Sequence, residues 1–116
     1  MTNYLRDIQD RLEKGFYADN FRDIGRVGAS AAEAVEHPLP FFLISRMFFS
    51  LDNFWREFPM EATTAQQMAE TLQPPLKKYL DAAQAGLSPE LEVEYLDDIV
   101  RAFISWGKVQ HKLKYQ

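Results

Sequence analysis

Few residues in this sequence have the types and the spacing that catalysis or metal binding requires. The two histidines, His37 and His111, are far apart, and only His37 has a carboxylate at helical spacing, Glu33. A di-metal helical bundle needs such ligands from four helices. Because Glu33 and His37 are the only such pair, we interpret His37 as an exposed histidine at a helix end and not as a metal ligand.

Three acids, Glu94, Asp97 and Asp98, fall at positions i, i+3 and i+4 and could bind a hard cation or serve as an acid and base pair. They lie in the first half of a predicted helix, where the helix dipole already favours negative charge. The chain has no cysteine, and Ser45, Ser50 and Ser105 have no histidine nearby. We therefore expect a non-enzymatic protein with no cofactor.

One group of side chains does point to a function, and we call it the aromatic strip. In a helix predicted over residues 40–58, two phenylalanines seven residues apart fall on the side opposite the apolar face, among polar residues. The strip consists of Phe42, Arg46, Phe49, Asn53 and Arg56. Aromatic residues and arginine are enriched in protein interfaces. The strip predicts contact with another protein or with a second copy, as a homodimer; the alternative is that both phenylalanines belong to the core.

A second group consists of small residues in the preceding helix. Gly25, Gly28, Ala29 and Ala32 leave one flank nearly free of side chains. A glycine inside a helix costs up to about 1 kcal/mol relative to alanine, so something should offset that cost. Close packing against another helix is the favoured explanation. The alternative is a surface open to a flat ligand, which would make the chain a carrier of an apolar or aromatic small molecule in a bundle pocket.

Hydrophobic residues recur with the helical period in every segment, and none alternates like a strand. The sequence predicts one all-α domain over residues 1–116, a compact bundle of four to six helices with up-and-down or irregular order. The helices near 40–58 and 89–114 are the most apolar. We expect both to be central, and the second to be mostly buried.

Local signals set the expected helix ends. Asn3 or Thr2 should cap the first helix, and Asp19 or Asn20 the second. Residues 64–67, Thr-Ala-Gln-Gln, have capping-box spacing, and the following Pro74-Pro75 predicts two short helices, the second closed by Gly86. Ser88-Pro89 should start the last helix.

Composition limits the cellular setting and the partners. The 116 residues, 47% of them hydrophobic, suffice for one core. The first residues lack an export signal, and the most apolar stretch, 41–51, is too short to cross a membrane, so we expect a cytoplasmic protein. The net charge is −4, which weighs against a nucleic-acid partner, although residues 101–116 contain four basic residues and no acid. A weak nucleic-acid binder acting through this end is the third hypothesis.

Overall fold

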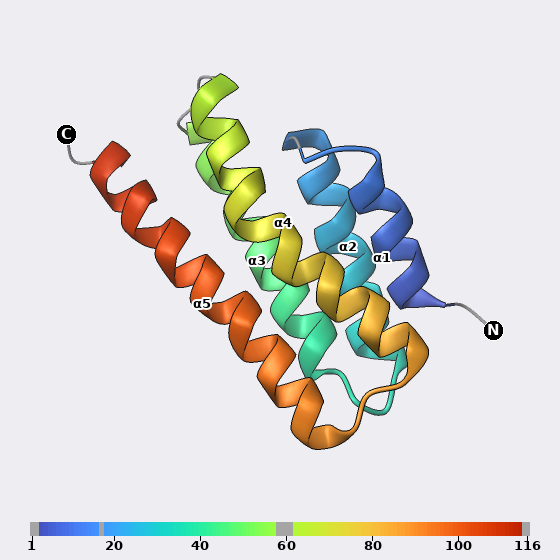
Figure 1. Ribbon diagram of the computed structural model, residues 1–116. Helices are drawn as coiled ribbons and strands as arrows, with labels where there is room; N and C mark the ends of the chain where they lie inside the picture. Colours follow the sequence, from blue (N-terminus) through green and yellow to red (C-terminus); the bar gives the residue numbers. More distant parts are fainter. Residues whose placement is uncertain (1–2, 17, 58–61, 115–116) are drawn as a thin grey trace. The chain divides into compact units, whose positions relative to one another are not determined.

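The computed structural model describes residues 3–16, 18–57 and 62–114, and every regular element within them is an α-helix (Figure 1). The helices are α1 (Tyr4–Glu13), α2 (Ala18–Ala34), α3 (Leu39–Glu57), α4 (Ala62–Ala85) and α5 (Pro89–Lys114). They confirm the predicted all-α class. No helix in these residues is long and apolar enough to cross a membrane.

The helices fall into two compact units. The first, Met1–Pro59, contains α1, α2 and α3, and the second, Met60–Gln116, contains α4 and α5. In the first unit α2 packs on both α1 and α3, and in the second α4 packs on α5. A single domain over residues 1–116 stays a prediction.

Several helix ends lie where the local residues predicted them. The Asn3 side chain caps α1 by accepting a hydrogen bond from the Arg6 backbone amide at 3.1 Å. Gly86 follows the last residue of α4 with a φ of 104°, a conformation that favours glycine. The Ser88 hydroxyl accepts a hydrogen bond from the amide three residues later at 3.3 Å, and α5 begins at Pro89. These ends depend on neighbouring residues only.

The predicted cap of α2 is wrong, because the helix begins at Ala18 and both Asp19 and Asn20 lie in its first turn. Asn20 is buried, and its side-chain amide donates to the carbonyls of Arg11 and Gly15, at 2.5 and 2.6 Å. Carbonyls at the end of a helix have no partner within it. Asn20 therefore closes the C-terminal end of α1 instead of starting α2.

Helix α4 runs without interruption through Pro74 and Pro75, so the prediction of two short helices is wrong. It also begins at Ala62, two residues before the predicted cap at Thr64. The two prolines remove backbone donors, but apolar side chains on both sides of them share one buried stripe. That stripe is Met68, Leu72, Leu76, Tyr79 and Leu80. Burial of a continuous stripe favours one helix axis over two.

Aromatic rings form much of the core of the first unit. Phe21 of α2 packs against Phe16, Phe48 and Trp55, with ring centroids 4.9 to 5.9 Å apart. Helix α3 supplies Phe48 and Trp55, and its buried residues run from Pro40 to Asp52. The aromatic cluster thus joins α2 to the helix that carries the predicted aromatic strip.

Helix α5 is more exposed than the mostly buried helix that the sequence predicts. Among its described residues only Ile99 and Trp106 are buried, and four large apolar side chains are exposed: Leu91, Val93, Ile104 and Val109. Within its unit α5 packs on α4 alone, so one helix covers only part of its wide apolar arc.

A hydrogen bond joins α4 to α5, because the Tyr79 hydroxyl of α4 donates to the Glu92 carboxylate of α5. Burial raises the pKa of the Tyr79 phenol well above its usual value, and the negative charge of Glu92 raises it further.

Candidate interaction surface on α3

Two glycines bring the backbone of α2 directly against that of α3. A Cβ added at Gly28 would lie 3.1 Å from both the Phe41 carbonyl oxygen and the Ser45 amide nitrogen. The Ser45 hydroxyl donates a hydrogen bond to the Gly25 carbonyl oxygen at 2.9 Å. Helix α3 therefore presents Ser45 to α2, although this residue lies on the side that the sequence marked as polar.

The same packing determines the place of Phe49. Its ring lies 3.1 Å from the position of an added Gly25 Cβ, and the side chain is half-buried. Ala29 and Ala32 are half-buried as well. Because α3 fills the surface that Gly25 and Gly28 leave open, those two glycines offer no room for a flat ligand, and the carrier hypothesis gains no support there.

Phe42, seven residues before Phe49, has a different environment. Its side chain is 53% exposed, and the Arg46 guanidinium lies over the ring, 5.7 Å from the ring centroid. Leu39, one turn earlier on the same face, is 57% exposed. We call Leu39, Phe42 and Arg46 the α3 patch. Two large apolar side chains and one cation thus lie together at the start of α3.

The other two residues of the predicted strip lie further along the helix. Asn53 is exposed. Arg56 is exposed and forms an ion pair with Asp52 at 3.2 Å, while Arg22 of α2 approaches the same buried carboxylate at 3.6 Å. Arg56 therefore helps to neutralise a buried acid that joins α2 to α3.

The structure therefore divides the aromatic strip. Phe42, Arg46 and Asn53 face solvent, Phe49 packs on Gly25, and Arg56 pairs with the buried Asp52. Sequence reasoning missed Leu39, because it started the helix one residue later, at Pro40. The signal was available: Leu39 precedes Phe42 by three residues, the spacing of neighbours on one helix face.

The titratable residues considered for chemistry lie apart from the α3 patch. Glu33 and His37 are exposed, and His37 lies beyond the last residue of α2. Glu94, Asp97 and Asp98 of α5 are also exposed, and Asp97 pairs with Arg101 of the next turn at 2.7 Å. In residues 3–16, 18–57 and 62–114, no three histidine, aspartate or glutamate side chains are grouped so that they could hold a metal ion.

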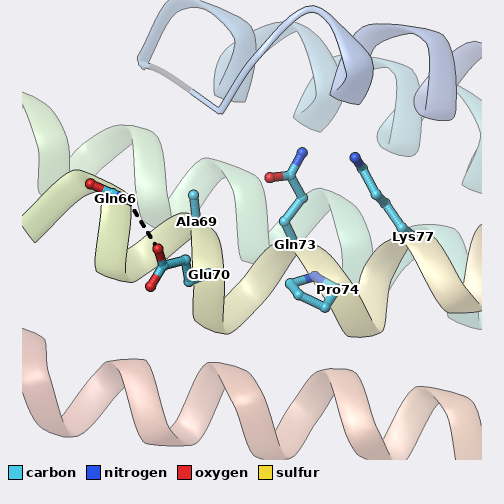
Figure 2. Close-up of a pocket in the computed structure, with 6 residues that line it drawn as sticks. All are labelled: Gln66, Ala69, Glu70, Gln73, Pro74 and Lys77. Carbon is cyan, nitrogen blue, oxygen red and sulfur yellow. Dashed lines mark hydrogen bonds between the residues drawn. The ribbon is translucent and has the colours of Figure 1, made fainter.

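A shallow hollow lies along α4, and all the residues that line it belong to this helix (Figure 2). They are Gln66, Ala69, Glu70, Gln73, Pro74 and Lys77. Figure 2 shows the hydrogen bond from the Gln66 amide to the Glu70 carboxylate, 3.1 Å long. Sites for apolar ligands enclose most of the ligand among hydrophobic side chains. This hollow is open and is lined by one helix only, so it does not have that character.

Comparison with known proteins adds no relative: no protein-family model, no curated protein and no solved structure matches the chain. The surface chemistry of the described residues is therefore the basis for a functional proposal.

Proposed function

We propose that this chain is a non-enzymatic interaction module that contacts a partner protein, or a second copy of itself, through the α3 patch. The observation that carries the proposal is the exposed Phe42 ring beside the exposed Leu39 side chain. Aromatic side chains contribute large apolar areas when a partner covers them. An exposed apolar group with a polar rim is typical of an interaction site.

Arg46 suits this role because its contact with the Phe42 ring combines charge with an apolar surface. An arginine held over an aromatic ring can still use its planar donors for a carboxylate of the partner. Aromatic and arginine side chains are also the types on which interface energy concentrates. A complementary partner would therefore present an apolar pocket bordered by acidic residues.

The experiment compares two charged variants of α3. The double substitution of Leu39→Glu and Phe42→Glu places acids on the α3 patch, whereas Ser50→Glu places one at an exposed position of the same helix outside it. Both should fold, because all three side chains are exposed. The variants and the parent are immobilised, and proteins captured from the source cells are quantified by mass spectrometry.

A photo-crosslinking amino acid at position 42, with position 50 as its control, then tests whether a captured protein touches the α3 patch. We expect the Ser50→Glu variant to capture the same protein as the parent and the double variant to lose it. Crosslinks should form from position 42 and not from position 50. If the folded double variant captures the same partner as the parent, or if no partner or second copy crosslinks through position 42, the proposal is wrong.

A further inference from the structure

A second apolar surface lies on α5, in the other compact unit. Val93 is 67% exposed and Ile104 is 56% exposed, and Leu96 and Val100 between them are only half-buried. At about 100° per residue these four side chains fall within about 80° of the helix circumference. We call Val93, Leu96, Val100 and Ile104 the α5 stripe. It lies to one side of Ile99 and Trp106, which are buried.

The charges beside the α5 stripe have a regular order. Glu90 and Glu94 lie on one flank of it in the first half of the helix, and Lys108 and Lys112 lie on the same flank in the second half. All four residues are exposed. Their positions are symmetric about Arg101: Glu94 and Lys108 are each seven residues away, and Glu90 and Lys112 are each eleven residues away.

This symmetry defines the partner that fits the surface. When two identical helices pair antiparallel about a two-fold axis near residue 101, the same flank of each helix lies on the same side of the pair. Glu94 of one copy then lies level with Lys108 of the other, and Glu90 with Lys112. Each such pair occurs twice in the dimer. Parallel pairing would instead place this flank of the two helices on opposite sides of the pair, so these glutamates and lysines would not face one another.

We propose that two copies of the chain pair antiparallel through the α5 stripe, with these glutamates and lysines as the charged border. Val100 and Ile104 lie one and three residues from the two-fold axis, so they would pack against the copy at the centre of the contact. Covering Val93 and Ile104 removes from water the two most exposed apolar side chains of the stripe. The α3 patch belongs to the other unit and contributes no residue to this contact.

The first test uses charge reversal. One variant carries Glu90→Lys and Glu94→Lys, and the other carries Lys108→Glu and Lys112→Glu. Each variant would set like charges together in its own dimer, whereas the mixture of the two would pair lysines with glutamates at all four places. Sedimentation velocity at several concentrations should give the parent a mass near twice the chain mass of 13.5 kDa. The dimer dissociation constant of each variant alone should be about tenfold higher than that of the parent, or more, and mixing the two variants should restore the dimer.

The second test determines direction and uses the absence of cysteine from the chain. Single variants Glu94→Cys and Lys108→Cys are treated with a short bis-maleimide crosslinker, separately and mixed. Antiparallel pairing predicts crosslinked dimers mainly in the mixture. Parallel pairing separates positions 94 and 108 of the two copies by about 21 Å along the helices and predicts no gain on mixing. The circular dichroism melt of each variant shows that it is folded.

Three results would overturn the proposal. The first is a parent that sediments as one chain at every concentration, because the α5 stripe is then uncovered or is covered within the chain. The second is a dimer that both charge-reversal variants form as tightly as the parent, because the contact then lies elsewhere. The third is a mixture of the two single-cysteine variants that crosslinks no more than each variant alone. None of these results depends on the α3 patch, whose partner is tested by substitutions on the other unit.

Discussion

Substituting alanine for three glycines in turn tests the close approach of α2 to α3. Gly28→Ala would place a methyl group 3.1 Å from backbone atoms of Phe41 and Ser45. Helix backbone cannot rotate aside as a side chain does, so α2 and α3 would have to separate by a few tenths of an ångström. Gly107→Ala is the matched control, because no described atom outside the local helix lies within 4 Å of its added Cβ.

The expected magnitudes follow from two opposing terms. Replacing an interior helical glycine by alanine stabilises the helix by about 1 kcal/mol. Overpacking a tight contact costs about 1 to 3 kcal/mol. Gly28→Ala should therefore lower the free energy of unfolding by up to about 2 kcal/mol, whereas Gly107→Ala should raise it by about 1 kcal/mol. Gly25→Ala should fall between them, because its close neighbour is the movable ring of Phe49.

Urea unfolding at low protein concentration gives these free energies. Tryptophan fluorescence is a suitable signal, because Trp55 lies in the same compact unit as Gly28, and Trp106 in that of Gly107. Helix content from circular dichroism shows whether each variant retains its secondary structure. If Gly28→Ala stabilises the protein as much as Gly107→Ala does, the two helix backbones do not meet at Gly28.

Three further substitutions test contacts that join the helices. Asn20→Ala should lower the free energy of unfolding by about 1 to 3 kcal/mol in urea titration, because the carbonyls of Gly15 and Arg11 lose the Asn20 amide and Arg11 keeps only the backbone donor of Lys14 among the hydrogen bonds of the described residues. The exposed Asn53→Ala should change it little. Asp52→Ala leaves two arginines without their carboxylate and should cost about 1 to 3 kcal/mol; an unchanged urea midpoint would contradict the ion-pair bridge between α2 and α3. Folding raises the pKa of the Tyr79 phenol, so the ionisation of this group does not affect stability at neutral pH. Above about pH 10 the unfolded chain loses the phenol proton first, and the free energy of unfolding should fall as the pH rises. Tyr79→Phe should lose less stability over that alkaline range, and equal slopes of stability against pH in parent and variant would refute the argument.

Much of the fold follows from local sequence signals. Helical periodicity gave the all-α class, and the cap at Asn3, the break at Gly86 and the start at Ser88-Pro89 lie where those residues predicted them. Each signal acts over about one turn, so it does not depend on which helix packs alongside. That is why these ends could be predicted without knowledge of the tertiary structure.

Signals that competed with distant packing were less reliable. Pro74-Pro75 predicts a break, yet the buried side chains on both sides of it belong to one stripe and α4 is continuous. Asn20 resembles a cap of its own helix, but in the structure its amide reaches the end of α1. In both cases the decisive contacts are made by residues beyond the local turn.

The sequence by itself placed Phe42 and Phe49 on one face of a helix, and it left Gly25 and Gly28 with an open flank. Only the tertiary structure decided that α2 packs beside α3 so that Phe49 meets Gly25 while Phe42 stays exposed. The physical reason is that helical periodicity determines the angle between side chains around one axis, whereas the direction from which a neighbouring helix approaches depends on the packing of both surfaces.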